Sequence, residues 1–264
     1  MKYDVVIVGS GIAGLFTALR CSQRGLSVLV VTKSRIKSSS TNWAQGGIAA
    51  VLDPADEMAI EAHVQDTISS GKGLCDESVV RSVVVEAAQR IADLVNFGVR
   101  FDGDSHNYHK AIEGGHSEPR ILHSKDRTGA EIEQALELAA TSKGFGGLKI
   151  NEDWMAIDLV QSKHGIPSSG VCGIWCLIAD GTVIEIQAKS IILATGGCGM
   201  LYKSTTNPTV STGDGVAMAH RCGADISDME FVQFHPTSLY GADRPFLITE
   251  AVSYTHLRAH ETPL

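Results

Sequence analysis

The first 31 residues of the chain combine four features in an order that strongly limits the fold. An apolar run, Val5–Val8, leads directly into Gly9-Ser10-Gly11-Ile12-Ala13-Gly14, a helical pattern follows, and a second apolar run covers Val28–Val31. A strand, the spacing Gly-x-Gly-x-x-Gly, a helix and another strand within about 30 residues are typical of a dinucleotide-binding unit. The glycines allow a tight turn, close approach to a pyrophosphate and close helix packing. The chain start therefore predicts an α/β, Rossmann-like fold with a parallel sheet.

The end of the second predicted strand differs from an ordinary NAD site. Such a site carries Asp or Glu there, which binds the ribose hydroxyls. This chain has Val31-Thr32-Lys33 instead. Thr32 has a hydroxyl suited to a ribose and Lys33 a cation suited to a phosphate. An ordinary NAD site is thus disfavoured, while another dinucleotide stays open.

Three later segments are also rich in glycine and hydroxyl groups. The polar stretch Ser38–Asn42 leads into Trp43-Ala44-Gln45-Gly46-Gly47, which offers backbone and hydroxyl donors to a phosphate or a flat ring. Ala194-Thr195-Gly196-Gly197 follows an apolar run, and ligands of open α/β sheets bind at such carboxyl ends of strands. Thr212-Gly213-Asp214-Gly215 precedes a helix predicted over 215–221. Asp214 either caps that helix or accepts hydrogen bonds from a cofactor.

The middle of the chain predicts helices first and strands later. Helices are expected over 59–70 and 77–97, the second with a buried apolar stripe that includes Val80, Val83, Val84, Ile91 and Leu94. Thr128 and Glu131 form a predicted capping box for a helix that ends near Thr141. Strands are expected over 148–150, 154–160, 171–178, 183–188 and 190–193, with a hairpin turn at Asp180-Gly181. The pattern indicates an antiparallel ribbon inserted between parallel-sheet elements.

The segment 102–127 is a dense polar loop. It contains Glu113, Arg120 and four histidines, His106, His109, His116 and His123. The spacing matches no common metal-binding motif, so we predict no metal. A solvated loop without a role stays open, but loops on a dinucleotide scaffold commonly carry recognition groups, which favours a substrate-facing loop. His235, held between Phe234 and Pro236, is a second candidate substrate ligand.

Charge and hydropathy exclude several function classes. The chain has 30 acidic and 22 basic residues, a formal net charge of −8, which disfavours nucleic-acid binding. No apolar run approaches the roughly 18 residues that span a bilayer. Asp4 interrupts any signal-peptide pattern, and the six cysteines are scattered. We therefore expect a soluble, cytoplasmic protein with neither nucleic-acid nor membrane partners.

The glycine motifs together with Gln233-Phe234-His235-Pro236-Thr237 resemble the flavoprotein family of succinate dehydrogenase, fumarate reductase and L-aspartate oxidase. The resemblance runs over residues 4–252, and Thr32-Lys33 is usual in that family. It implies an incomplete FAD-binding domain over 1–229 and the start of a substrate capping domain over 230–252. Family members continue further and carry a catalytic arginine beyond this match. Residues 253–264 resemble a translated sequencing adapter, and we assign them no function.

Two positions distinguish the branches of that family. Succinate dehydrogenase flavoproteins attach FAD covalently through a histidine at the position of Ser40, so the resemblance implies non-covalent FAD here. Glu113-Gly114-Gly115-His116-Ser117 resembles the L-aspartate oxidase branch, in which the glutamate orients the amino group of the substrate.

The resemblance also assigns site residues. The substrate would contact Glu113, through its amino group, and His235, Thr249 and Glu250, with His235 and Thr249 near a carboxylate. The FAD-binding residues it implies are Gly9, Ser10, Gly11, Ile12, Ala13, Gly14, Lys33, Ser40, Thr41, Asn42, Trp43, Ala44, Gln45, Gly46, Gly47 and Asp214.

The reaction implied by the resemblance is hydride transfer from the α-carbon of L-aspartate to the flavin, which gives iminoaspartate. O2 or fumarate would reoxidise the flavin, and quinolinate synthase, which leads to NAD, is the implied partner. Without the catalytic arginine, we expect this chain alone to be inactive. A fumarate reductase or succinate dehydrogenase flavoprotein, or a non-catalytic dinucleotide-binding module, stays open as an alternative.

Overall fold

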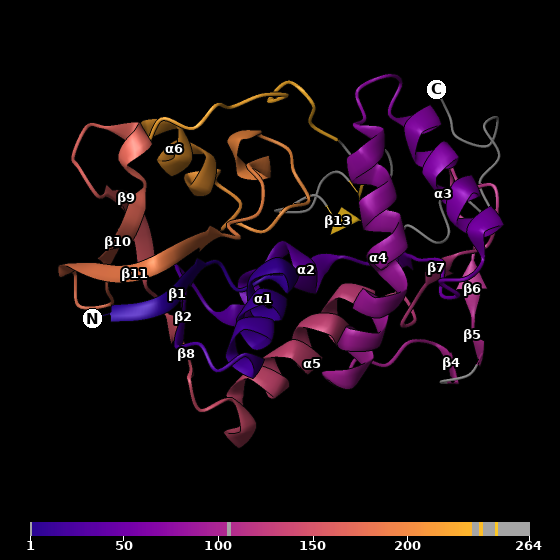
Figure 1. Ribbon diagram of the computed structural model, residues 1–264, viewed down its shortest axis with the longest axis horizontal. Coiled ribbons are helices and arrows are strands. Elements are labelled where there is room, and N and C mark those ends of the chain that lie inside the picture. Colours follow the sequence, from indigo (N-terminus) through magenta and orange to yellow (C-terminus); the bar gives the residue numbers. More distant parts are fainter. Residues whose placement is uncertain (1, 105–106, 234–237, 240–245, 248–264) are drawn as a thin grey trace. The chain divides into compact units, whose positions relative to one another are not determined.

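The computed structural model describes residues 2–104, 107–233, 238–239 and 246–247 (Figure 1). The chain forms two compact units. The first combines Met1–Trp43 with Glu133–Leu247, and the second is built on Ala44–Ile132. Among the described residues, the chain therefore leaves the first unit after Trp43 and returns to it at Glu133.

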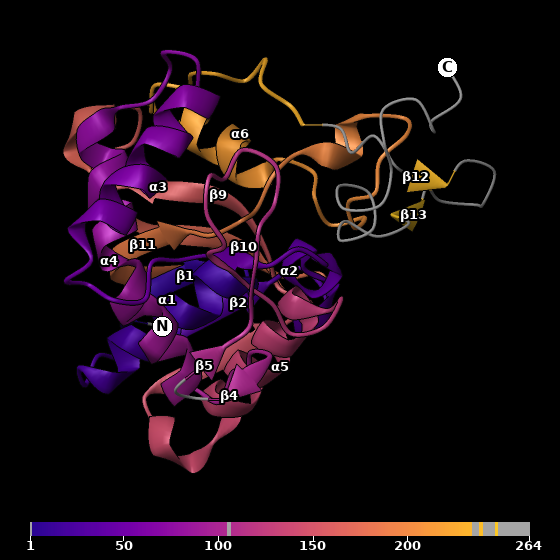
Figure 2. The same cartoon turned by 90° about the vertical axis from the view of Figure 1, so that its right-hand side faces the viewer.

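The first unit contains a six-stranded sheet with the order β8-β2-β1-β11-β10-β9 (Figures 1 and 2). Neighbours among β8, β2, β1 and β11 run parallel, whereas β10 pairs antiparallel with both β11 and β9. The predicted Rossmann-like fold with an antiparallel insertion is confirmed. The strands are β1 (Lys2–Val8), β2 (Val28–Thr32), β8 (Leu148–Glu152), β9 (Met155–Gln161), β10 (Val171–Leu177) and β11 (Val183–Leu193).

The prediction of two strands over 183–188 and 190–193 is wrong, because β11 is continuous. Its first half pairs antiparallel with β10, and its second half pairs parallel with β1. Lys189, the residue between the two predicted strands, is an exposed position of the one strand. The Lys189 Nζ lies 2.7 Å from Asp4 Oδ1, so the lysine forms an ion pair at the surface of the sheet.

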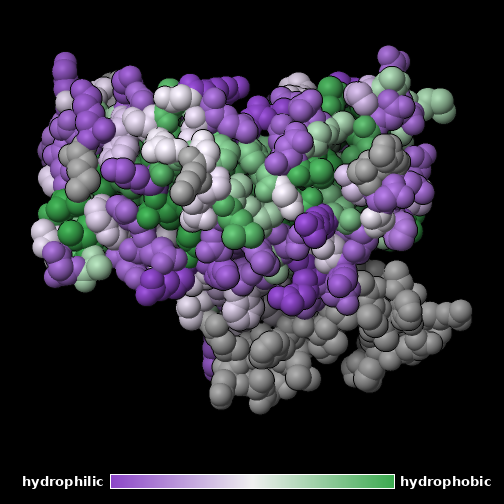
Figure 3. All heavy atoms as spheres, turned by 90° about the horizontal axis from the view of Figure 1, so that it is seen from below, coloured by the Kyte–Doolittle hydropathy of each residue, from purple (hydrophilic) through white to green (hydrophobic). Residues whose placement is uncertain are grey.

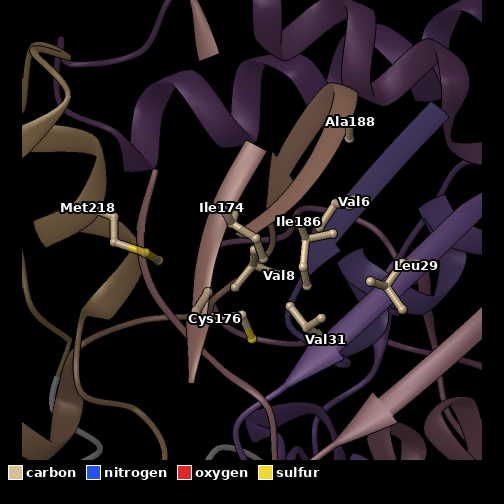
Figure 4. Close-up of a cluster of buried hydrophobic side chains, with 10 residues drawn as sticks. Val6, Val8, Leu29, Val31, Ile174, Cys176, Ile186, Ala188 and Met218 are labelled. Carbon is tan, nitrogen blue, oxygen red and sulfur yellow. The ribbon is translucent and has the colours of Figure 1, made fainter. Parts of the chain in front are cut away.

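Successive residues of the central strands point to opposite sides, and both sides are buried. Val5, Ile7, Val28 and Val30 pack with Ala18 of helix α1 (Ile12–Gln23). The opposite cluster joins β1 and β2 to the antiparallel ribbon and to helix α6 (Asp214–Arg221). Figure 4 shows members of this second cluster, among them Val6, Val8, Leu29, Val31, Ile174, Cys176, Ile186, Ala188 and Met218. Because side chains pack on both faces of the sheet, the end of β1 and the turn that follows it are held in place.

The longer helices are close to their predicted positions. Helices α3 (Glu57–Ser70) and α4 (Glu77–Asn96) begin after Asp56 and Asp76, whose side chains accept hydrogen bonds from the first turn. The predicted buried stripe of α4 is too wide, because Val83 is 66% exposed while Val84, Ile91 and Leu94 are buried. On the face in Figure 3, hydrophobic and hydrophilic residues are interspersed.

The predicted capping box of helix α5 (Thr128–Thr141) does not form. Thr128 is the first helical residue, and its hydroxyl accepts from Ser124 N and lies 3.5 Å from Gln45 O. Glu131 Oε1 accepts from Arg100 N instead of from the helix start. Both side chains therefore bind neighbouring segments, which the local pattern could not reveal.

The remaining elements are short. In the second unit, β3 (Ile48–Ala49), β7 (Ile121–Leu122) and β6 (Lys110–Ala111) form a three-stranded sheet, and β4 (Gly103–Asp104) pairs with β5 (Asn107–Tyr108). The others are η1 (Ile36–Ser38), α2 (Ser40–Trp43), η2 (Lys143–Phe145), η3 (Pro167–Ser169), η4 (Gly199–Leu201), β12 (Ser238–Leu239) and β13 (Phe246–Leu247). Within the described residues, none of the helices has both the length and the apolar character needed to cross a bilayer.

Candidate functional site

A cavity of about 410 Å³ lies in the first unit, at the carboxyl ends of β1, β2 and β11. Open α/β sheets bind ligands at this edge. The cavity is lined by the β1–α1 turn, by residues 33–35 and 38–41, and by parts of the segments that follow β11. Nine of the predicted FAD-binding residues line it, namely Gly9, Ser10, Gly11, Ile12, Ala13, Lys33, Ser40, Thr41 and Asp214.

The glycines of the first turn meet specific packing demands. Gly9 has a φ of +112°, and a β-carbon there would overlap the carbonyl oxygen of Ala194. A β-carbon on Gly14 would overlap the carbonyl oxygen of Gly9, so Gly14 lets α1 approach the turn. At Gly11, the nearest atom to such a carbon is Thr41 Oγ1, at 3.1 Å. Gly9 and Gly14 therefore shape the turn, and Gly11 leaves room for the Thr41 hydroxyl beside it.

Hydroxyl groups surround the N-terminus of α1. The Ile12 N–H donates to Thr41 Oγ1 at 3.0 Å, and the Thr41 N–H donates to Ser39 Oγ at 3.1 Å. Ser40 Oγ lies 3.1 Å from Ser211 Oγ. A helix N-terminus with nearby N–H and O–H donors favours an anion such as a pyrophosphate. The cavity thus has the donor groups that the phosphates of FAD require.

Lys33 and Asp214, which are 181 positions apart, meet at this cavity. Lys33 Nζ lies 2.5 Å from Asp214 Oδ2 and 2.5 Å from Thr212 Oγ1, and Thr212 donates to Asp214 Oδ1 at 2.7 Å. Burial acts to raise the pKa of Asp214, but the bonds from Lys33 and Thr212 outweigh it and lower that pKa. Gly213, with a φ of +77°, is the N-cap of α6, so Asp214 is not the cap. Its carboxylate instead binds Lys33 and Thr212 at the cavity lining.

Glu133 is a residue of this region that the sequence interpretation missed. Its side chain is 1% exposed, and Oε2 accepts a hydrogen bond from Ser39 Oγ at 2.5 Å. The sequence did contain a sign that Glu133 is buried, because on a helix this residue shares a face with the apolar Leu136 and Ala140, which are buried. A glutamate on a buried face calls for a specific partner.

In the second unit, the predicted flavin-binding segment Ala44–Gly47 packs against β7 and the residue after it. A β-carbon on Gly47 would overlap the Leu122 carbonyl oxygen and would lie 2.8 Å from His123 Cε1. His123 Nε2 in turn lies 3.3 Å from Glu113 Oε1. The structure therefore brings together the glycine segment and the predicted substrate acid, with His123 between them.

A buried cation anchors the loop that carries Glu113. Arg120 is 3% exposed, and its Nη1 donates to Asp66 Oδ2 of α3 at 2.6 Å. The same oxygen accepts from Ser117 N and Ser117 Oγ, both at 2.8 Å. These hydrogen bonds lower the pKa of Asp66 to about 2, with that from Arg120 the strongest cause. The loop is thus tied to a helix by charge-assisted bonds.

The other predicted residues are placed differently. Asn42 and Trp43 belong to the first unit but do not line the cavity; Asn42 Nδ2 donates to Lys37 O, and Trp43 is 47% exposed. His235, Thr249 and Glu250 lie outside the described residues. Their roles, like those of the cavity residues, stay predictions. In the described part of the chain, no three His, Cys, Asp or Glu side chains gather as metal ligands would.

Known proteins match the chain over nearly its whole length. The family model described as "FAD binding domain" matches residues 4–255. The L-aspartate oxidase of Streptomyces coelicolor is 44% identical over 255 residues, which cover 94% of this chain and 43% of that protein. The chloroplastic L-aspartate oxidase of Arabidopsis thaliana is 46% identical over 263 residues, covering 95% and 39%.

Solved structures agree with the fold. A quinol fumarate reductase FrdA from E. coli has a TM-score of 0.87 at 30% identity, covering 96% of this chain and 42% of that one. Sdh1 from Mycobacterium smegmatis has a TM-score of 0.85 at 31% identity, covering 96% and 44%. The chain spans about two fifths of the length of the relatives it matches.

Proposed function

Because this chain belongs to the FAD binding domain family, with FAD as its cofactor, we propose that it is the FAD-binding part of an L-aspartate oxidase. The observation that carries the proposal is the pairing of Glu113 with His123 beside the glycine segment of the second unit. An acid in that place suits a substrate with an ammonium group. Relatives at 44–48% identity carry the name L-aspartate oxidase, which supports the same choice.

The residues at the first-unit cavity suit FAD. The N-terminus of α1 and the hydroxyls of Ser40 and Thr41 would bind the pyrophosphate, while Lys33 and Asp214 would bind polar groups of the nucleotide. When bound, FAD supplies a two-electron acceptor. Ser40 offers no imidazole for a covalent link, so we propose that FAD is held non-covalently.

The substrate side rests on charge. Glu113 would accept a charge-assisted hydrogen bond from the ammonium of L-aspartate and so orient its α-carbon. His123 Nε2, 3.3 Å from Glu113 Oε1, would hold the carboxylate in place. His235, Thr249 and Glu250 remain the proposed contacts of the rest of the substrate, with His235 and Thr249 near a carboxylate.

The proposed product is iminoaspartate, and the proposed final electron acceptor is O2 or fumarate. Quinolinate synthase is the proposed consumer of the product.

A cytoplasmic location stays a prediction, since the plant relatives are named chloroplastic. We propose that the 264-residue chain binds FAD but needs the rest of a full-length relative for turnover.

Replacing Glu113 by glutamine is expected to lower kcat/KM for L-aspartate about 10- to 100-fold, because one hydrogen bond to a charged group is lost. The test uses residues 1–252 joined to the corresponding remainder of the Streptomyces coelicolor enzyme, with peroxide formation as the readout. Glu118→Gln, an exposed neighbour in the same loop, is the matched control and should leave kcat/KM unchanged. Equal kcat/KM values for Glu113→Gln and the parent would contradict the proposed role.

The likeness to fumarate reductase and Sdh1 structures favours one second candidate, a fumarate reductase or succinate dehydrogenase flavoprotein. The same joined protein separates the candidates. Oxidation of L-aspartate without oxidation of succinate supports the oxidase, and the reverse supports the second candidate. Binding of FAD with neither activity would favour a non-catalytic dinucleotide-binding module.

A further inference from the structure

We propose that Glu133 is a positioning residue for FAD, which fixes the Ser39–Thr41 segment at the N-terminus of α1 and makes FAD affinity depend on pH. This inference rests on the proposed binding of the FAD pyrophosphate at that helix end. Glu133 lies on α5 and is not among the residues that line the cavity. It acts through other side chains.

A chain of hydrogen bonds leads from Glu133 to the helix end. Ser39 Oγ donates to Glu133 Oε2 at 2.5 Å and accepts from the Thr41 N–H at 3.1 Å. The Thr41 hydroxyl then accepts from the Ile12 N–H at 3.0 Å. Ser39 Cβ and Oγ also lie 3.6 Å from the position of a β-carbon on Gly11. Each bond orders the next group toward the site where the phosphates would bind.

The second oxygen of Glu133 gives the carboxyl group an unusual protonation behaviour. Oε1 is buried and has no hydrogen-bond partner among the described residues. Burial raises the pKa of Glu133 to about 7, although bonds from Ser39 and from the Asn42 backbone N–H oppose this. Glu137, on the same helix, raises that pKa further, and Lys37, on the facing segment, lowers it. A proton on Oε1 leaves Oε2 free to accept the hydrogen bond from Ser39.

The neutral form of Glu133 is therefore the one suited to FAD. In that form the segment keeps its hydrogen bonds, and no buried anion lies behind the groups that bind an anionic pyrophosphate. Bound FAD raises the pKa of Glu133 further, since two negative charges near each other disfavour ionisation. By linkage, FAD affinity falls as the pH rises above about 7, the value for the free protein. A pKa rise of about half to one unit on binding corresponds to an affinity roughly three- to tenfold lower at high pH.

The test is a titration of the 264-residue chain with FAD, followed by flavin fluorescence at about pH 6 and about pH 8.5. The parent chain should bind FAD about three- to tenfold more weakly at the higher pH. Glu133→Gln keeps a neutral acceptor, so its affinity should match the parent at the lower pH and should not fall at the higher one. Glu133→Ala removes the acceptor and should weaken binding about tenfold at both pH values, because buried partners lose their bonds.

Glu137→Gln is the matched control, since it removes a carboxylate one turn along α5 that does not bind Ser39. It should bind FAD like the parent at the lower pH and retain the decrease in affinity at the higher pH. Should Glu133→Ala fail to fold in a thermal unfolding scan, the comparison of Glu133→Gln with the parent still decides. Equal pH dependence in those two proteins would overturn this inference. Failure of the parent to bind FAD at either pH would instead overturn the proposed function.

Discussion

Replacing Gly14 by alanine is expected to abolish FAD binding by this chain. The added methyl group would overlap the carbonyl oxygen of Gly9, which is backbone and cannot rotate away as a flexible side chain could. The N-terminus of α1 must then move away from the β1–α1 turn, and the groups proposed to bind the pyrophosphate move with it. Overpacking of this kind typically costs about 1–3 kcal/mol of folding free energy, and the misplaced donors add to the loss of binding. Flavin fluorescence titration and thermal unfolding measure the two effects.

Gly146→Ala is the matched control for this substitution. Gly146 has a φ of −58°, and a β-carbon there would meet no atom within 4 Å. The control should bind FAD like the parent. If Gly14→Ala also binds FAD with the affinity of the parent, the helix end is not the pyrophosphate site.

Replacing Arg120 by alanine is expected to destabilise the second unit by about 1.5–3 kcal/mol, since the partly exposed Asp66 loses a charge-assisted hydrogen bond from a buried cation. Asp66 would lose its shortest hydrogen bond, and the loop that carries Glu113 would lose its anchor on α3. Urea unfolding monitored by circular dichroism gives the change in the free energy of unfolding. Arg81→Ala is the control: Arg81 pairs with Glu61 at an exposed site, where such a pair contributes less than about 1 kcal/mol. Similar losses for both variants would contradict the anchoring role of Arg120.

The same ion pair predicts the response to acid. The pKa of Asp66 is lowered to about 2 in the folded chain, below its ordinary value of 3.8. Its contribution to stability is therefore complete above about pH 4 and is lost as the pH falls toward about 2. Asp66→Asn removes this contribution, so the difference in unfolding free energy between parent and variant should shrink over that range. A constant difference would argue against the pair.

Local sequence patterns predicted the parts of the fold that local forces determine. Gly9 and Gly14 could be assigned because only glycine tolerates the close contacts that the turn requires, and their spacing is visible in the sequence. The antiparallel ribbon followed from short apolar runs and one hairpin turn. The single strand β11 did not, because its continuity depends on two different neighbours. Exposed Lys189 resembled a break only when those neighbours were unknown.

For the candidate FAD site, the sequence predicted individual residues but not the contacts between them. Lys33 and Asp214 were each identified, but their direct bond joins residues 181 positions apart and only the fold could reveal it. Glu133 was missed because its importance comes from Ser39, 94 positions earlier. Thr128 and Glu131 matched a local capping pattern, yet each binds a separate segment. Contacts over such distances leave little trace in a single sequence.

The chain leaves the first unit after Trp43 and re-enters it at Glu133. The Ser39–Glu133 hydrogen bond links the segment before residues 44–132 to the segment after them, so both ends of this insertion are held within the first unit. An insertion whose ends are clamped in this manner tolerates change in its interior, because the framework does not depend on its length. Substrate preference could therefore diverge through residues 48–132, which follow the predicted FAD-binding segment Ala44–Gly47, while the FAD-binding residues stay the same.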